Sequence, residues 1–215
     1  MRRYSSAVAR INSIGVFIIG GAISNQARTS EFLAAGTMEW QEGPALPESM
    51  NHICAVVITP TSFLAIGWTS IYELNIAIAG PTSNDSWEEA GRWPTLKKGR
   101  GLFGCAKIGQ KVIIAGGWAS GALSSTEVLD LDSRQISSGG ELAAPRYRFH
   151  IATIVIEGEE KMFALAGSST HTLWKTNTVE EWVEESSTWK AADNLVEKRT
   201  EFGAVVMPKH LICPA

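Results

Sequence analysis

Four apolar runs, each ending in glycine, recur along the chain at a nearly constant spacing. The runs are Val16–Gly21, Phe63–Trp68, Val112–Gly117 and Phe163–Ser168. Their first glycines are 47, 49 and 51 residues apart. A period in this range is typical of repeat architectures, in which every unit is one small supersecondary element. Such a unit cannot bury its apolar surface alone, so the repeat predicts stacked units that share a core.

A tryptophan follows three of the four glycines at a similar distance. Trp40 and Trp87 stand 20 residues after their glycines and Trp189 stands 22 after its own, while Ile136 takes this place in the third unit. Nine residues before these four positions lie Glu31, Ile78, Glu127 and Glu180. A large apolar side chain at such a position can fill the wedge between two neighbouring sheets.

A third marker, Arg-x-x-Phe, precedes the glycine runs of the later units. It occurs at Arg100–Phe103, Arg146–Phe149 and Arg199–Phe202. Three markers in one order at one period predict units of four short antiparallel strands. The second strand would end at the glycines, because glycine permits a positive φ and a close approach of neighbouring sheets.

Together these markers resemble the kelch repeat, and the resemblance covers nearly the whole chain. It carries a glycine pair, a glutamate about 11 residues later, a tryptophan about 20 residues later and a Pro/Arg opening. The resemblance implies a kelch-type β-propeller, the architecture also of the galactose-oxidase-like central propeller. The departures are Gly67-Trp68 and Gly167-Ser168 for the glycine pair, Ile78 for the glutamate and Ile136 for the tryptophan.

We therefore expect an all-β fold, a kelch-type β-propeller domain or fragment over residues 1–215. The expected four-stranded blades lie near residues 1–47, 48–97, 98–145 and 146–197, with the start of a fifth at 198–215. No helix longer than two turns is expected. Since no obvious strands complete the fifth blade, we expect an incomplete ring, from a fragment, a truncated gene product or an open arc.

Charge and hydropathy argue against two classes of partner. The net charge is −3, and no run of Lys or Arg forms a track for nucleic-acid phosphates. The stretch from Ser49 to Tyr72 carries no Asp, Glu, Lys or Arg and is long enough to span a bilayer. However, residues 59–62 divide it into two halves of strand length that follow the repeat. Neither nucleic acid nor membrane is therefore expected as a partner.

The cysteines Cys54, Cys105 and Cys213 are odd in number, and their spacing fits no zinc motif. Because Cys54 and Cys105 lie in apolar runs, we expect small core residues in a reducing compartment. The alternative is that Cys213, near the end of the chain, carries a free thiol. The first residues do not form a signal peptide, so we expect a cytoplasmic protein, or a secreted one if the true N-terminus is missing.

The search for catalytic residues gives no clear centre. His52 and His150 are expected at equivalent positions of first strands, where they could line a central channel. A metal would need further ligands nearby, so we expect no metal and no cofactor. Tyr4, Tyr72 and Tyr147 match no site of the copper-radical oxidases that share the propeller, and no Gly-x-Ser-x-Gly motif occurs.

Strand direction predicts one binding face. The start of each first strand and the end of each second strand lie on one edge of an antiparallel unit. That edge would carry Met50, Leu102, Arg148 and Glu201 from the first set, and Asn25, Trp68, Trp118, His171 and Trp174 from the second. Trp and Arg dominate interface hot spots. We expect the partner at Arg148, Glu201, Leu102, Trp118, Trp174 and Trp68.

Alternatives stay open at this face. Trp68 and Trp118 could pack under their own loops. The basic pair in Arg146-Tyr147-Arg148 could bind a carboxylate or phosphate of a partner, or could be an ordinary surface pair.

The sequence thus favours a non-catalytic protein–protein interaction module whose partner is another protein or peptide. The alternative is a propeller enzyme or carbohydrate-binding domain, copper-radical oxidase-like or sugar-handling, with its site at the channel mouth. Fold is weak support for either function.

Overall fold

The computed structural model describes residues 5–11, 14–21, 28–76, 93–169, 174–204 and 206. Within these residues the chain consists of strands β1 to β15 joined by turns and loops, and no α-helix occurs. The prediction of an all-β fold is confirmed for the described part of the chain.

The strands form four antiparallel sheets, each with its strands paired in sequence order. Sheet 1 contains β1 (Ala7–Ile11), β2 (Gly15–Ile19), β3 (Ser30–Ala34) and β4 (Trp40–Glu42). Sheet 2 contains β5 (Cys54–Thr59), β6 (Ser62–Ile66) and β7 (Ile71–Asn75). Sheet 3 contains β8 (Gly104–Ile108), β9 (Lys111–Ala115), β10 (Thr126–Asp130) and β11 (Gln135–Gly139). Sheet 4 contains β12 (His150–Ile156), β13 (Glu159–Ser168), β14 (Lys175–Val183) and β15 (Thr188–Ala192).

The fourth strand expected for sheet 2, near Trp87, lies outside the described residues, as does Ile78.

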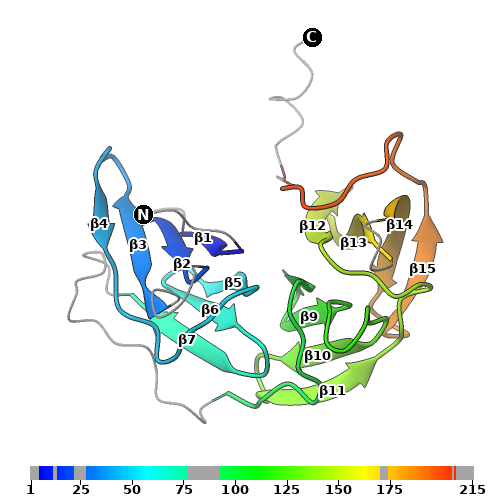
Figure 1. Cartoon of the computed structure of the whole chain (residues 1–215), viewed down its shortest axis with the longest axis horizontal. Coiled ribbons are helices and arrows are strands. Elements are labelled where there is room, and N and C mark those ends of the chain that lie inside the picture. The colour runs from blue at the N-terminus through cyan, green and yellow to red at the C-terminus, as the bar shows by residue number, and fades with distance from the viewer. Residues whose placement is uncertain are drawn as a thin grey trace.

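The four sheets are arranged in a propeller-like arc. Their first strands lie side by side in order, with β1 next to β5, β5 next to β8 and β8 next to β12. Figure 1 shows these strands innermost, and the outer strands β4, β7, β11 and β15 around the periphery. The arc is open between sheet 1 and sheet 4 in this view. Residues on the first strands of all four sheets therefore face a common centre.

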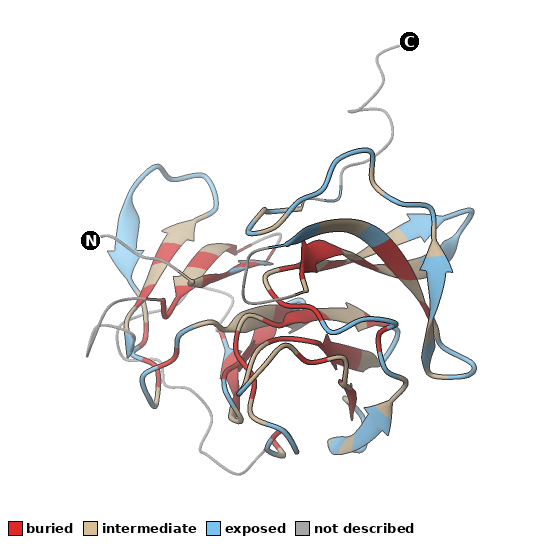
Figure 2. Ribbon diagram, turned by 45° about the vertical axis from the view of Figure 1, so that its right-hand side comes forward, coloured by how far each residue is buried: buried red, intermediate tan, exposed pale blue. Residues whose placement is uncertain are grey.

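Apolar clusters fill each of the three spaces between neighbouring sheets. Between sheets 1 and 2, Phe17 lies against Phe32 and Phe63, with ring centroids 4.6 and 5.3 Å apart. A second cluster joins sheets 2 and 3, and a third joins sheets 3 and 4. Figure 2 shows the buried residues on the inner strands and exposed ones on the outer strands. Burying one such side chain stabilises the fold by about 1.5–3 kcal/mol.

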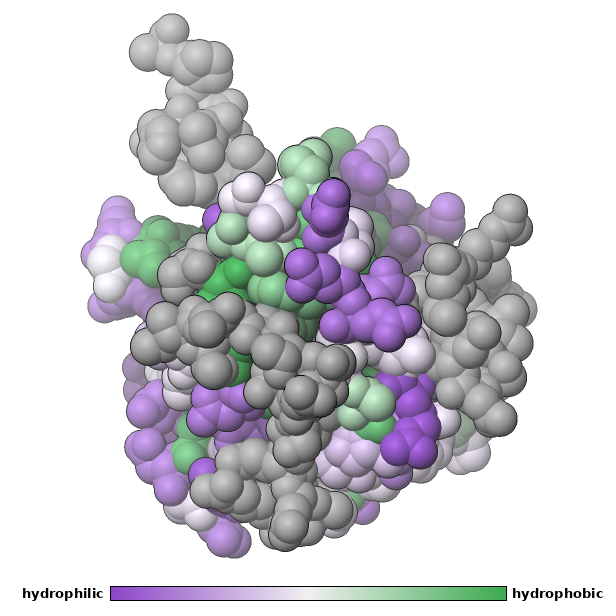
Figure 3. All heavy atoms as spheres, turned by 90° about the vertical axis from the view of Figure 1, so that its left-hand side faces the viewer, coloured by the Kyte–Doolittle hydropathy of each residue, from purple (hydrophilic) through white to green (hydrophobic). Residues whose placement is uncertain are grey.

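The predicted role of the repeated tryptophan is confirmed where a neighbouring sheet is present. Trp189 lies 5.2 Å from Trp182, edge to face, and its Nε1 donates to Thr126 Oγ1 of sheet 3 at 2.9 Å. Ile136 packs against the cluster between sheets 2 and 3 in the same way. Trp40, on the outer strand of sheet 1, is 45% exposed. On that side of the molecule hydrophilic and hydrophobic residues are interspersed (Figure 3).

The arginine of the Arg-x-x-Phe motif and the repeated glutamate form a buried ion pair in sheet 3. Arg100 is fully buried, and its Nη2 lies 2.7 Å from Glu127 Oε1. Its Nη1 donates to the carbonyls of Gly116 and Ser125 at 2.9 and 2.8 Å. Burial lowers the pKa of Arg100 while the charge of Glu127 raises it, and the guanidinium stays charged at neutral pH.

Sheet 4 repeats the same network. Arg146 is buried and pairs with Glu180, and its Nη1 donates to the carbonyls of Ala166 and Thr178 at 3.2 Å each. The Glu180 carboxylate also accepts the N–H of Ala143 at 2.8 Å. Breaking a buried pair of this kind by removing one partner costs about 3–5 kcal/mol. In sheets 3 and 4 the two markers are therefore one structural device that fastens the opening of the unit to its own third strand.

Sheet 2 has an apolar substitute for this pair. The partner of Ala65 across the ladder is Tyr72, just as Ile114 faces Glu127. Met50 takes the place of Arg100, because each lies four residues before the first strand of its sheet. Met50 and Tyr72 are both buried in the cluster between sheets 1 and 2. The sequence assignment of Ile78 to the glutamate position is thus wrong, because the loop after Gly67 is short.

The ends of second strands are tied to the next unit by one recurring backbone hydrogen bond. The donors are the N–H groups of Gly21, Gly117 and Gly167, and the acceptors are the carbonyls of Met50, Arg146 and Arg199. Gly116 has a φ of +60°, and a Cβ there would lie 2.6 Å from the Arg146 carbonyl oxygen. In sheet 4 the corresponding residue is Ala166, which also has a positive φ of 52°. The close approach of the next unit explains why glycine ends these strands.

The residues Met50 and Tyr72, which sheet 2 has in place of the buried ion pair, suggest a test of that pair. Arg100→Met should destabilise the protein by about 3–5 kcal/mol, because Glu127 would remain buried without its cation. The double variant Arg100→Met/Glu127→Tyr, which copies the residue pair of sheet 2, should recover at least half of this loss. Urea unfolding of the three proteins measures both effects. A double variant less stable than Arg100→Met would contradict the structural equivalence of the two pairs.

Candidate functional site

One position of each unit lies at the mouth of the central channel with the same unusual backbone. The residue two places before each of the four first strands has a left-handed conformation, as does the equivalent residue of the Arg199–Phe202 motif, with φ between 52° and 56°. These residues, here called the rim residues, are Ser5, His52, Leu102, Arg148 and Glu201. Left-handed backbone costs a non-glycine residue about 1–2 kcal/mol. Five such residues at one structural position show that the rim repeats even where the side chains differ.

Backbone hydrogen bonds connect successive rim residues around the mouth. The N–H of His52 donates to the carbonyl of Ser5 at 3.1 Å, and that of Arg148 donates to Leu102 at 2.9 Å. The N–H of Glu201 donates in turn to Arg148 at 3.1 Å. His52, Arg148 and Glu201 are thus each held by the rim residue of the unit before them, which fixes their order around the axis.

The rim encloses a cavity of about 600 Å³. Its lining consists of all five rim residues and of Ser6, Phe103, Phe149 and Phe202. The phenylalanines are those of the three Arg-x-x-Phe motifs. The mouth therefore combines apolar walls with a few polar groups, which is the usual composition of a ligand-binding site.

Arg148 is the central charged group of the mouth. Its Nη1 lies 2.9 Å from Glu201 Oε1, and its guanidinium carbon lies 5.6 Å from the centre of the Tyr147 ring. The Nε of Arg148 is buried and has no hydrogen-bond partner among the described residues. The Glu201 side chain is 58% exposed, so the ion pair is open to solvent and adds little stability.

His52 lies beside this arginine. Burial lowers the pKa of His52 below its ordinary value of 6.5, and the positive charge of Arg148 lowers it further. Its Nδ1 is buried without a hydrogen-bond partner in the described part of the chain. The imidazole is therefore neutral at neutral pH and offers a hydrogen-bonding group to a ligand in the mouth.

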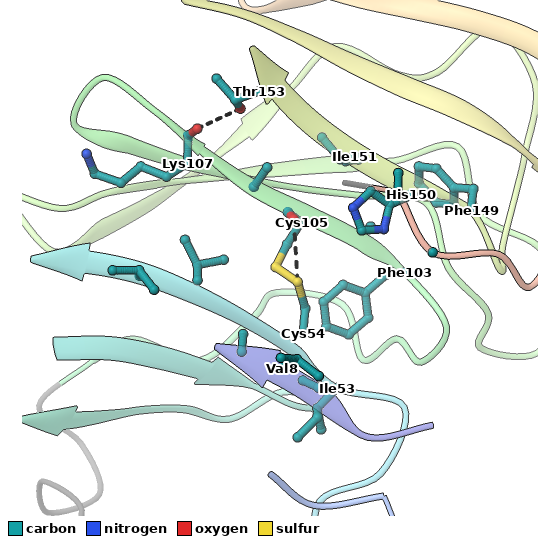
Figure 4. A pocket seen from close by; sticks show the side chains of 18 of the residues that line it. Val8, Ile53, Cys54, Phe103, Cys105, Lys107, Phe149, His150, Ile151 and Thr153 are labelled. Atoms are coloured by element: carbon teal, nitrogen blue, oxygen red, sulfur yellow. Dashed lines mark hydrogen bonds between the residues drawn. A yellow bond between two sulfur atoms is a disulfide. The ribbon is translucent and has the colours of Figure 1, made fainter. Parts of the chain in front are cut away.

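Below the mouth lies the channel itself, a cavity of about 840 Å³ between the first strands. Residues from β1, β5, β8 and β12 line it together with Gly203 and Ala204 (Figure 4). His150 is among them, and burial lowers the pKa of its imidazole. Thr153 Oγ1 donates to the Lys107 carbonyl at 2.7 Å and ties β12 to β8.

Cys54 and Cys105 form a disulfide across the channel wall. The expectation that both are reduced core cysteines is corrected by this bond. The repeat explains the pairing, since the two residues are 51 positions apart, about one period, on adjacent first strands. The cytoplasmic location stays a prediction, and it no longer has the support of these two cysteines, because disulfides persist mainly in oxidising compartments. Cys213 lies outside the described residues.

Three of the six predicted partner-binding residues come together in the structure. Leu102, Arg148 and Glu201 are rim residues that line the same cavity. Trp118 is half-buried beside them, with its ring 5.0 Å from that of Tyr147 and its backbone in bridges to Gly101 and Ala122. Trp118 therefore packs against Tyr147, the residue that precedes Arg148, and is not itself part of the cavity lining.

Trp68 and Trp174 lie outside this cluster. Trp68 is 55% exposed, and its indole lies against the backbone of Gly99. Trp174 is 68% exposed on the loop that connects β13 to β14. Both contribute apolar surface without lining the mouth.

The structure corrects three other expectations for this face. Met50 is buried in the core between sheets 1 and 2. Arg146 is buried with Glu180, so the basic pair is split, and only Arg148 reaches the mouth. His52 and His150 are not equivalent, because His52 matches Arg148 whereas His150 matches Cys54. Asn25 and His171 lie outside the described residues.

The opposite edge serves to connect sheets. Glu160 Oε2 accepts the N–H of Gly109 at 2.7 Å, and Lys111 Nζ pairs with Glu184 at 3.2 Å. These bonds join the turns of sheet 3 to those of sheet 4. Glu160 thus has a hydrogen-bond partner in the neighbouring sheet.

Sequence reasoning did not assign His52 and Ser5 to the binding face. The signal was present, because Met50–Ile53 aligns with the three Arg-x-x-Phe motifs once Met is accepted in place of Arg. The third residue of each motif is the rim residue.

Neither a scan against protein-family models nor a search of curated proteins finds a match. Within the described residues, no group of three or more His, Cys, Asp or Glu side chains is placed to hold a metal ion. Nor does any helix there have the length and apolar character to cross a membrane. The fold and the mouth define the class of the protein: an all-β, propeller-like chain with a lined central channel.

The two channel histidines predict a pH dependence of stability. Their pKa values are lowered in the folded state, so the unfolded chain binds more protons at acidic pH. Stability from these groups is complete above pH 6.5 and should be lost as the pH falls below 6.5. Thermal unfolding at a series of pH values should show this loss. The variant His52→Gln/His150→Gln should have a flatter profile, and an unchanged profile would contradict the assignment.

Proposed function

We propose that the chain is a kelch-type, non-catalytic protein-interaction module that binds a protein or peptide at the channel mouth. The observation that carries this proposal is the rim, where five different non-glycine side chains occupy a strained backbone position. Glycine would adopt that conformation without strain. Strained backbone is found preferentially where side chains are held ready for a ligand.

The chemistry of the mouth supports a partner with both apolar and acidic groups. Leu102, Phe103 and Phe149 supply apolar walls. The exposed ion pair of Arg148 with Glu201 can be replaced by a carboxylate of the partner, and the Nε of Arg148 has no hydrogen-bond partner among the described residues. The exposed Trp68 and Trp174 extend the contact area on the same edge.

The kelch assignment and the fifth unit belong to this proposal. The carbonyl of Arg199 accepts the N–H of Gly167 as that of Arg146 accepts the N–H of Gly117. Glu201 then takes the rim conformation of its predecessors. These contacts support the start of a fifth unit within an incomplete ring.

A charge swap at the mouth tests the proposal. The variant Arg148→Glu/Glu201→Arg keeps an ion pair between the two positions, so its thermal midpoint should stay close to that of the unchanged protein. Partners isolated by cross-linking and mass spectrometry should bind this variant about tenfold more weakly or worse.

The matched control swaps a pair on the opposite edge. Lys161 Nζ lies 3.0 Å from Glu159 Oε2, and Lys161→Glu/Glu159→Lys exchanges the same charges. This control should bind every partner as the unchanged protein does. Equal binding by both swapped proteins would mean that the mouth is not the docking face.

The second candidate function is a carbohydrate-binding or oxidase-like propeller. The channel is the specific observation that favours it. A volume of about 840 Å³ is within the range of small-ligand sites. Under the interaction proposal, a panel of mono- and disaccharides should leave the thermal midpoint unchanged, and elemental analysis should find no stoichiometric copper. Saturable stabilisation by a sugar, or one bound copper, would favour the second candidate.

A further inference from the structure

The Cys54–Cys105 disulfide joins two sheets that share no strand pairing. Cys54 begins β5 and Cys105 lies in β8, with their Cα atoms 6.2 Å apart. In the described ranges no backbone hydrogen bond connects β5 to β8. Side-chain packing and the disulfide therefore hold the first strands of sheets 2 and 3 together.

The bond faces the channel. Both cysteines line the cavity of about 840 Å³, and Cys105 is 8% exposed while Cys54 is half-buried. Figure 4 shows the two sulfur atoms between the ribbons of β5 and β8, next to Phe103. A channel of this volume admits a molecule of drug size, whereas a folded protein cannot enter it.

One side of this joint is sheet 2, in which Met50 stands at the place of the buried arginine of sheets 3 and 4. Sheets 3 and 4 fasten their openings with Arg100–Glu127 and Arg146–Glu180. At the opening of sheet 2, the Met50 side chain lies in an apolar cluster instead. The disulfide is therefore a strong fastening of a sheet whose opening has no such ion pair among the described residues.

We propose that Cys54–Cys105 is a reversible thiol–disulfide exchange site, reached through the channel by low-molecular-weight thiols, that locks the joint between sheets 2 and 3. A thiolate of the small molecule attacks Sγ of Cys54, the more exposed of the two residues, and the electron pair of the broken bond leaves on Cys105 as a thiolate.

A second small thiolate attacks the sulfur atom of the first small molecule in the mixed disulfide and releases Cys54 as a thiolate. Both protein thiolates take up protons. Two small thiols thus become one small disulfide while the protein gains two thiol groups, and the small disulfide reverses the reaction.

The first experiment follows the bond in the folded 215-residue chain. The protein is treated with glutathione disulfide and then with reduced glutathione at a temperature well below unfolding, and free thiols are trapped with iodoacetamide. Peptide mass spectrometry should find the linked Cys54–Cys105 peptide first and two alkylated cysteines afterwards. Absence of the linked peptide after oxidation, or reduction only under unfolding conditions, would overturn the proposal.

The second experiment tests the lock and the route. Reduction should lower the thermal midpoint by roughly 5–15 °C. Cys54→Ser/Cys105→Ser should have the midpoint of the reduced protein and ignore the reductant, while the control Cys213→Ser should keep the full shift. A thiol-terminated polyethylene glycol should reduce the bond far more slowly than glutathione. Equal midpoints of oxidised and reduced protein would refute the lock, and equal rates with both thiols would refute the route through the channel. Neither experiment needs a partner, so each is independent of the proposed interaction function.

Discussion

The fold depends on the burial of sheet faces against neighbouring sheets. A single four-stranded sheet has two faces, and each apolar cluster of this chain contains residues of two consecutive sheets. The first strands must approach closely for this, which limits side-chain size near the axis. A Cβ on Gly104 would lie 2.6 Å from Ile151 Cγ1 of the next sheet. Apolar burial and small residues at the centre thus act together, and the channel is the space that remains.

Much of this was predictable because the markers have local causes. The glycine runs predicted the second strands, which the structure places at β2, β6, β9 and β13. The pairing of Arg100 with Glu127 was not predicted, since a charged residue is expected on the surface and its burial depends on a partner 27 residues away. The same reason explains the error at Ile78: without the ion pair, no sequence signal identified Tyr72 as the equivalent residue.

At the candidate site, too, some features were predictable from the sequence and others were not. Strand direction placed Leu102, Arg148 and Glu201 on one edge, and the structure brings them into one cavity. Their left-handed backbone was not predictable from residue type, because Leu and Arg have no preference for it. The conformation instead goes with contacts between units, since the N–H groups of His52, Arg148 and Glu201 each donate to the rim residue of the preceding unit. The disulfide could have been inferred from its one-period spacing, but only with knowledge that successive first strands are neighbours.

The units differ most in how their openings are fastened, and this difference has consequences. A buried guanidinium such as that of Arg100 or Arg146 stays charged over the physiological pH range. A disulfide that faces a channel responds to the thiols around it. The second unit departs from the repeat at Met50, Gly67-Trp68 and Tyr72, and it is also the unit that carries Cys54. The second unit thus has Met50 and Tyr72 in place of the buried ion pair, and the disulfide, which thiols can reduce reversibly, joins this unit to the third.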